Sequence, residues 1–340
     1  MNNKNIIQED IESILLQNCD FSILKNKTIL LTGATGLIGS VITDMLCFLN
    51  VKYNLNLKLL LISRHEHESK SSCTKYIVHD INIPFVSNEK IDFIIHAASN
   101  THPVQYASEP IETITANIFG TYNLLQLAEK NKNCRFILAS SVEIYGDDKE
   151  CKTKGFEEKD CGYLDCNTVR AGYNESKRLC ETLCQAFLAQ KKVDFVSARL
   201  CRAYGPTLKK DDSKVMSQFL RNGADTKDII LKSEGLQYYS YIYSADAASA
   251  IIYLMLKGKS GEAYNIAGKD SDIHLKDLAQ IIADYSGTKV IFDLPSAIEK
   301  QGFSKAQHAV LNTDKICELG WKPVYSILDG CKRTIDYFKV

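Results

Sequence analysis

Neither sign of charge prevails in this 340-residue chain, because Lys+Arg and Asp+Glu both number 41. No overall electric field therefore draws the protein to nucleic acid or to an anionic membrane, and we expect neither as a partner. An apolar stretch long enough for a signal peptide or a membrane span is also absent. The first apolar residues, among them Ile6, Ile11 and Ile14, have helical spacing broken by charge. We therefore expect a cytoplasmic protein with a helical N-terminal extension over residues 1–26.

A C-x-x-C pair is absent despite twelve cysteines. In a long chain without a secretion signal, such cysteines are expected to stay reduced and to pack mostly in the interior. The closest cysteine pairs, Cys161/Cys166 and Cys180/Cys184, lack the histidine partners of a zinc site, and the histidines of 65–67 lie in a polar turn. We expect no metal ion.

What the chain does contain near its start is an apolar run that breaks into glycines and resumes as a helix, TILLTGATGLIGS at 28–40. Gly33 allows a tight turn, Gly36 lets the backbone approach a pyrophosphate, and Gly39 lets the helix pack on its strand. The free N–H groups at the start of the helix then attract phosphate. This spacing predicts a dinucleotide site, with glycines that serve strand–helix packing alone as the alternative.

Strand-like and helix-like segments alternate along most of the chain. Because the strand-like runs are apolar throughout, we expect a doubly wound parallel (Rossmann) α/β sheet, covered on both faces, with its ligand at the carboxyl ends of the strands. The alternation loosens from about Tyr204. This predicts a dinucleotide-binding domain over 27–203 and a smaller α/β substrate lobe over 204–340, of which two segments can return to the first domain. The expected strands are 28–31, 57–62, 76–79, 93–96, 135–139, 195–200, 228–231 and 262–266, and the expected helices are 37–49, 111–130, 173–190, 244–256 and 275–285.

A tyrosine and a lysine four residues apart form the second constellation, in the segment YNESK that begins at Tyr173. On a helix the two side chains project from one face, so the ammonium group of Lys177 lies near the phenol and favours the phenolate that a catalytic base requires. Ser141 stands upstream, at the end of the strand-like segment ILAS. The alternative is a solvated helix face, on which this pair is common.

Together these motifs resemble the extended short-chain dehydrogenases/reductases of the nucleotide-sugar epimerase and dehydratase type. The resemblance runs from about Lys27 to Trp321, and its marks, in family order, are TGATGLIG, Asp80-Ile81, HAA at 96–98, Asn117, SSVEIYG, YNESK, YGP and LGWKP. It implies that a nicotinamide cofactor performs the hydride step. It also implies that Tyr173 exchanges a proton with a sugar hydroxyl, that Ser141 hydrogen-bonds the same oxygen, and that Lys177 holds the nicotinamide ribose.

The same resemblance implies the cofactor contacts. Where NAD enzymes carry a carboxylate after the second strand, this chain has Ser63-Arg64. A serine can donate to a 2′-phosphate and an arginine can clamp it, which favours NADP over NAD. The alternative is that Arg64 stacks on the adenine, which suits either cofactor. The expected cofactor-binding residues are Gly33, Thr35, Gly36, Leu37, Ile38, Gly39, Ser63, Arg64, Asp80, Ile81, Ala97, Ala98, Tyr173 and Lys177.

Glu143, in SSVEIYG, indicates chemistry beside a keto group. The resemblance places it where 4,6-dehydratases and uronate decarboxylases carry a glutamate. Once C4 of the sugar is a ketone, protons on the adjacent carbons become acidic and a carboxylate can move one. Val142 stands where dehydratases have an acidic residue, which disfavours dehydration, whereas Arg170 fits the decarboxylase-like pattern R-x-x-Y-x-E-x-K. The uronate decarboxylase branch is therefore the nearest.

Two departures from the family pattern concern the negative charges of the substrate. Tyr239 replaces an arginine that commonly serves the diphosphate, and Arg202 replaces an asparagine before YGP. We expect Arg202 to supply the displaced positive charge to the phosphates or to an acidic sugar group, with an internal ion pair as the alternative. The expected substrate-binding residues are Ser99, Arg170, Arg202 and Tyr239.

The expected function is NAD(P)-dependent modification of a nucleoside-diphosphate sugar, by hydride transfer at C4 with proton transfer assisted by Glu143, in an epimerase-type rearrangement. The alternatives are a 4-keto-sugar reductase that uses NADPH, a dehydratase or decarboxylase, and a non-catalytic dinucleotide-binding regulator. We expect a homodimer, because the helices at 111–130 and 173–190 have more apolar residues than one sheet face needs, although one subunit could bury them all. These residues are Leu124, Leu127, Leu179, Leu183 and Phe187.

Overall fold

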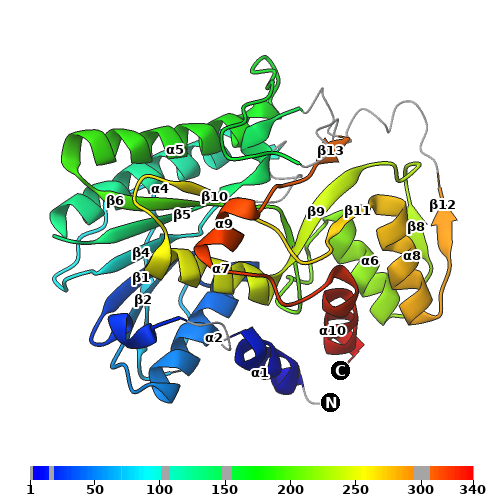
Figure 1. Ribbon diagram of the computed structural model, residues 1–340, viewed down its shortest axis with the longest axis horizontal. Helices are drawn as coiled ribbons and strands as arrows, with labels where there is room; N and C mark the ends of the chain where they lie inside the picture. Colours follow the sequence, from blue (N-terminus) through cyan, green and yellow to red (C-terminus); the bar gives the residue numbers. More distant parts are fainter. Residues whose placement is uncertain are drawn as a thin grey trace.

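A seven-stranded parallel sheet forms the larger half of the molecule (Figure 1). The computed structural model describes residues 3–14, 19–69, 71–100, 108–147, 155–293 and 307–339. Helices cover both faces of the sheet and bury most residues of its central strands, which confirms the predicted doubly wound α/β fold. In the order in which they pair, they are β10 (Ala263–Ile266), β6 (Asp194–Leu200), β5 (Arg135–Ser141), β4 (Phe93–His96), β1 (Thr28–Thr32), β2 (Lys58–Ser63) and β3 (Thr74–Val78).

The strand order reverses at β1, which pairs with β2 on one side and with β4 on the other. Sheets of this kind bind ligands outside the carboxyl ends of the strands at the point of reversal. Thr32 and His96 end β1 and β4 and lie opposite each other in register. Any ligand is thus expected beside these two residues.

Two helical layers cover the sheet (Figure 1). One layer consists of α4 and α5, and the other contains α2 and α7. Side chains that alternate along β1 divide between the layers: Leu30 packs into the core under α4 and α5, whereas Ile29 and Leu31 pack toward α2 and α7. These helices are α2 (Leu37–Lys52), α4 (Pro110–Lys130), α5 (Ala171–Lys191) and α7 (Ser244–Lys257).

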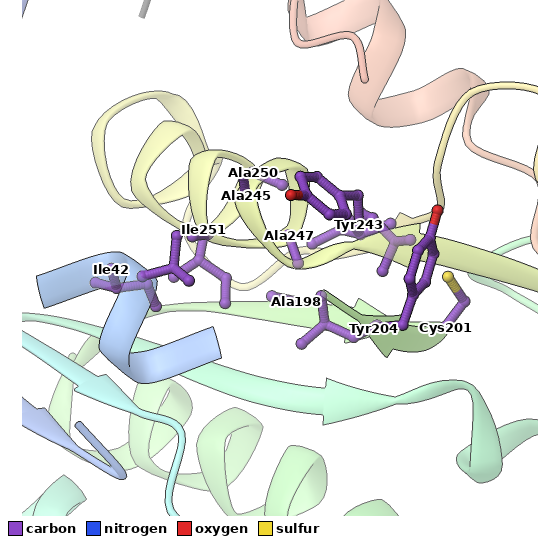
Figure 2. Close-up of a cluster of buried hydrophobic side chains, with 14 of the residues drawn as sticks. Ile42, Ala198, Cys201, Tyr204, Tyr243, Ala245, Ala247, Ala250 and Ile251 are labelled. Carbon is purple, nitrogen blue, oxygen red and sulfur yellow. The ribbon is translucent and has the colours of Figure 1, made fainter. Parts of the chain in front are cut away.

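Helix α7 is almost wholly buried, and its sequence SADAASAIIYLMLK combines small residues in the first half with large apolar residues in the second. Figure 2 shows Ile251 of this helix beside Ile42 of α2, and Ala247 above Ala198 of β6. Side chains this small let the helix axis approach the sheet closely without leaving voids.

A smaller unit continues from the large sheet (right half of Figure 1). Its centre is β9, which pairs antiparallel with β11 and parallel with β7 and β13, while β8 and β12 form a separate parallel pair. Strand β7 begins two residues after β6 ends, so the chain passes from one sheet directly into the other. The strands are β7 (Arg202–Tyr204), β8 (Ile229–Leu231), β9 (Tyr238–Tyr243), β11 (Asp272–His274), β12 (Val290–Phe292) and β13 (His308–Ala309), and the helices are α6 (Val215–Ala224), α8 (Leu275–Ser286) and α10 (Ile327–Lys339). Helix α9 (Asp314–Leu319) lies instead beside β10 of the large sheet (Figure 1).

The N-terminal segment contains a helix, α1 (Asn3–Ile14), and a short 3₁₀ helix, η1 (Phe21–Leu24). Helix α1 packs against both α7 and α10, and Ile6, Ile11 and Ile14 are buried. The carboxylate of its Asp10 accepts a hydrogen bond from the Tyr243 hydroxyl and pairs with Arg333 of α10. The predicted helical stripe therefore attaches this segment to both halves of the molecule.

Candidate active site

The turn after β1 has the geometry of a phosphate cradle. Gly33 has a φ of +76°, and a Cβ added to it would lie 2.7 Å from the backbone of Ala97. A Cβ on Gly39 would lie 2.1 Å from the carbonyl oxygen of Gly33, so no larger residue fits there. Gly36 precedes the first turn of α2 and supplies no side-chain cap, which leaves the N–H groups of Leu37 and Ile38 available to an anion. These residues fit the pyrophosphate of a dinucleotide.

The segment after β4 completes this cradle. Thr32 Oγ1 lies 2.8 Å from Nδ1 of His96 and accepts a hydrogen bond from the Ala98 N–H group at 3.2 Å. Burial, with a smaller contribution from the charge of Lys177, lowers the pKa of His96 to about 3, so its ring is neutral at pH 7. Thr32 was not among the predicted site residues, although its place at the end of the TILLT strand was a usable signal.

The residues expected at the adenosine end lie on the β2–β3 side of the sheet. Ser63 ends β2, where its hydroxyl accepts the His65 N–H group at 3.3 Å, and Arg64 beside it is exposed. Asp80 accepts the N–H group of Asn82 at 2.9 Å, and Thr35 is exposed. The carbonyl of Ile81 accepts a hydrogen bond from Asn123 of α4 at 2.9 Å.

Ser99 is tied to α4 and α5 through one asparagine. Its hydroxyl donates to Oδ1 of Asn117 at 2.7 Å, and the amide of Asn117 donates to the Ser176 hydroxyl at 2.9 Å. Asn117 is 1% exposed, so both contacts are shielded from water. This asparagine therefore fixes the segment that follows β4 relative to the helix of the YNESK motif.

The predicted catalytic residues come from α5 and from the end of β5. Tyr173 and Lys177 are 6% and 3% exposed, and the ammonium nitrogen of Lys177 lies 6.0 Å from the centre of the Tyr173 ring. The ammonium group donates to the carbonyl of Ala139 at 2.9 Å, two residues before Ser141. Ser141 caps the 3₁₀ helix η2 (Val142–Tyr145) by accepting the Glu143 N–H group at 3.2 Å. Lys177 thus joins the helix that carries Tyr173 to the strand that carries Ser141.

Burial lowers the pKa of Lys177, so its positive charge is held at a cost in folding free energy. We expect Lys177→Met to raise the free energy of unfolding at neutral pH by about 1–3 kcal/mol, with a smaller gain above pH 10, where the unfolded lysine also loses its charge. Denaturant unfolding measures the change, with Lys130→Met on an exposed site of α4 as the control. A destabilised Lys177→Met protein would contradict this prediction.

Glu143 lies between two arginines. Its carboxylate oxygens are 3.7 Å from Nη2 of Arg170 and 3.6 Å from Nη2 of Arg202. Asn174, one residue after Tyr173, donates to both the backbone carbonyl and the carboxylate of Glu143, at 2.9 and 3.3 Å. The glutamate side chain keeps 24% of its surface exposed. Asn174 was missed by sequence reasoning, although it lies inside the YNESK motif.

Arg202 and Tyr239 meet because their strands pair. The guanidinium carbon of Arg202, on β7, lies 3.5 Å from the centre of the Tyr239 ring, on β9. Its Nη1 is buried and has no hydrogen-bond partner among the residues that the structure describes. Such a group is costly unless an anion or water reaches it. The structure therefore gathers Arg170, Arg202 and Tyr239 around Glu143, and Ser99 makes its contact with Asn117 instead.

The remaining cysteine and histidine clusters form no metal site. Cys180 and Cys184 are buried, whereas Cys161, Cys166 and the 65–67 turn are exposed. Over the described part of the chain, no three cysteine, histidine or carboxylate side chains come together as metal ligands. In the same residues, every helix is too short or too polar to cross a bilayer.

Known proteins resemble this chain over most of its length. The family model "NAD dependent epimerase/dehydratase family" matches residues 29–267. UDP-glucuronic acid decarboxylase 1 of Xenopus tropicalis is 29% identical over 315 residues, which cover 92% of this chain and 72% of the frog protein. UDP-glucuronic acid decarboxylase 3 of Arabidopsis thaliana is 28% identical over 93% of this chain and 90% of its own length.

Solved structures share the fold. UDP-glucose 4-epimerase of Thermotoga maritima, crystallised with UDP-glucose, superposes with a TM-score of 0.77 and 19% identity, over 92% of this chain and 98% of that one. The dTDP-glucose 4,6-dehydratase of Bacillus anthracis, in complex with NAD, gives 0.74 and 20% over 92% and 96%. The chain thus belongs to the NAD-dependent epimerase/dehydratase family, within the extended short-chain dehydrogenases/reductases, and is a sugar-nucleotide enzyme that depends on a nicotinamide cofactor.

Proposed function

We propose that the chain decarboxylates a nucleoside-diphosphate uronic acid. The observation that carries this proposal is the buried Nη1 of Arg202, which lacks a partner among the described residues and lies in the same cluster as Glu143. With Arg170, the cluster holds two positive charges and one negative charge, so one further carboxylate would balance it. The two decarboxylases described above, which cover more than nine-tenths of this chain, support the same substrate class.

In this proposal the glycine turn after β1 and Lys177 would hold a nicotinamide cofactor, which when bound would supply reversible hydride exchange at C4 of the sugar. Tyr173 removes the proton from the C4 hydroxyl, while Ser141 hydrogen-bonds that oxygen and Lys177 supplies the nearby positive charge. The resulting C4 ketone stands β to the carboxylate on C5, so carbon dioxide can leave without a further oxidant. Glu143, whose side chain is 24% exposed, then relays a proton from water to C5, where it replaces the lost carbon dioxide.

A second candidate is an epimerase-type rearrangement, and the position of Glu143 favours it. The same carboxylate could remove a proton beside the keto group and allow its return on the other face. Val142, buried beside Glu143, offers no acid for a leaving hydroxyl, which argues against a dehydratase.

Mass spectrometry of the products tests the proposal. The purified enzyme is incubated with UDP-glucuronic acid, with UDP-glucose and with a UDP-4-keto sugar, each with and without NADPH. Loss of carbon dioxide from the uronic acid is expected. An unchanged mass with a changed retention time on chromatography would favour the epimerase, and a gain of two hydrogens by the 4-keto sugar that depends on NADPH would favour a reductase.

For the cofactor we propose NADP over NAD, because an exposed arginine and a serine hydroxyl, with no carboxylate, end β2. We expect Arg64→Ala to weaken NADP binding by about tenfold or more, as for a lost charge-assisted hydrogen bond, and to leave NAD nearly unchanged. Calorimetric titration with both cofactors measures this. An equal loss for both would indicate that Arg64 only stacks on the adenine.

We also propose a homodimer formed through α4 and α5. Leu124 and Leu127 are buried inside the subunit, so the prediction that these two leucines exceed what one subunit can bury is wrong. Phe119, Tyr122 and Leu179 are instead 51%, 41% and 42% exposed on these helices. Measurement of the molar mass in solution tests this proposal, and a monomer at all concentrations would reject it.

A further inference from the structure

Helix α5 contacts the segment 140–145, here called the catalytic loop, in addition to carrying Tyr173. Asn174 and Arg178 each follow a predicted catalytic residue, Tyr173 and Lys177, and lie on the neighbouring face of the helix. Asn174 donates to the carbonyl of Glu143 at 2.9 Å, and Nε of Arg178 donates to the carbonyl of Ile144 at 2.6 Å. The segment that contains Glu143 is therefore fastened to α5 by its backbone.

Glu181 lies on the same face, one turn farther along α5. One of its carboxylate oxygens accepts a hydrogen bond from Oγ of Ser140 at 2.6 Å. Arg199 of β6 forms a two-pronged ion pair with the same carboxylate, with a shortest distance of 2.7 Å. The two charged side chains are only 14% and 12% exposed. Because Ser140 directly precedes Ser141, Glu181 fixes the start of the catalytic loop.

Arg199 extends this contact to the other end of the loop. Its Nη1 donates to the Tyr145 hydroxyl at 2.8 Å, and that hydroxyl donates to Oδ1 of Asn265 on β10 at 2.6 Å. Tyr145 is fully buried, and its hydroxyl is held between Arg199 and Asn265 by these two hydrogen bonds. A single carboxylate thus connects α5 to both ends of the segment that carries Ser141 and Glu143.

We propose that Glu181 is a positioning residue for the reaction. With Arg199 it sets the distance between the Tyr173 hydroxyl on α5 and the groups of Ser141 and Glu143 on the loop. The inference rests on the catalytic set proposed above but not on the decarboxylation itself, because every reaction of this family that begins with hydride transfer at C4 needs Tyr173 and Ser141 at one oxygen. A misplacement of 1 Å costs about 100-fold in rate.

The surroundings of Glu181 allow its charge to be removed without a large loss of stability. A cavity of about 450 Å³, lined among others by Glu181, Arg199 and Ser197, lies beside the ion pair. Water in this cavity can solvate Arg199 when the negative charge is removed, which limits the loss of stability. Glu181→Gln keeps the size of the side chain and an oxygen that can accept from Ser140.

The test compares Glu181→Gln with Glu129→Gln, which breaks a partly exposed ion pair to Lys191 between α4 and α5. For any nucleotide sugar that reduces the bound cofactor in the unaltered enzyme, we expect Glu181→Gln to slow that reduction by about 10- to 100-fold. KM and cofactor affinity should change little, and Glu129→Gln should behave as the unaltered enzyme. Reduction at the unaltered rate in folded Glu181→Gln protein would overturn the proposal.

Combination with Ser141→Ala separates positioning from a general loss of structure. If Glu181 acts through the loop, Glu181→Gln should slow the Ser141→Ala enzyme by no more than about twofold. Full additivity of the two losses would overturn the proposal.

Should Glu181→Gln fail to fold, Ser140→Ala removes only the hydrogen bond to Glu181. It is expected to slow hydride transfer by about three- to tenfold at unchanged KM, and an unchanged rate would again reject the idea.

Discussion

Tyr173→Phe is expected to lower kcat by about three orders of magnitude and to leave the affinity for the cofactor nearly unchanged. The phenol oxygen is the group proposed to take the proton from the C4 hydroxyl. Without it, hydride cannot leave C4, because the positive charge that develops there has no base to relieve it. Phenylalanine keeps the ring in its buried place, 6.0 Å from the Lys177 ammonium nitrogen.

Rapid mixing with the nucleotide sugar measures this directly, through the absorbance of the reduced nicotinamide. Tyr53→Phe, at the exposed end of α2, is the matched control and should retain full activity. A Tyr173→Phe enzyme that reduces its cofactor at the unaltered rate would remove Tyr173 from the chemistry. A biological role unaffected by the same change would instead favour the non-catalytic regulator.

Arg202→Met is expected to raise the KM for an acidic nucleotide sugar by about 30- to 300-fold, as for a truncated charge pair, with the fold retained. The methionine can still pack on the Tyr239 ring, but the positive charge and the buried Nη1 are lost. Lys315→Met is the matched control, because Lys315 also stacks on a tyrosine and pairs with a glutamate, at 2.6 Å from Glu262.

Comparison of two substrates shows which anion Arg202 binds. If it binds a carboxylate on the sugar, the KM for UDP-glucuronic acid should rise and the binding of UDP-glucose should hardly change. If it binds the diphosphate, both should weaken by the same factor. Unchanged values for both would leave Arg202 as an internal partner of Glu143 alone.

Regular elements of the large sheet were predictable because their signals are local. The TILLT strand and the glycine turn after it, the helix with the YNESK motif and the alanine-rich α7 all lie within two residues of their expected bounds or extend them by a few residues. Helices α6 and α10 and strands β7, β9, β11, β12 and β13 were not predicted, because most are short and are stabilised by partners distant in sequence. The division into domains at residue 204 stays a prediction.

The motifs predicted the candidate residues Ser141, Glu143, Tyr173 and Lys177, since each stands at a definite place in a local pattern, and their roles stay predictions. The contacts among these residues could not be predicted. Sequence reasoning left open whether Arg202 binds the substrate or forms an internal ion pair. The structure has the ion pair to Glu143 together with a buried nitrogen that lacks a described partner, so the two alternatives are compatible.

The fold class, the glycine turn and the candidate chemical groups were readable from the chain alone, because glycine spacing, apolar alternation and a tyrosine–lysine pair act over a few residues. Which charges meet depends on the packing of the folded chain. Arg202 stacks on Tyr239 because β7 pairs with β9, and Glu181 reaches Ser140 and Arg199 because α5 lies across β5 and β6. Such contacts join residues tens of positions apart, and the packing of sheets and helices sets them.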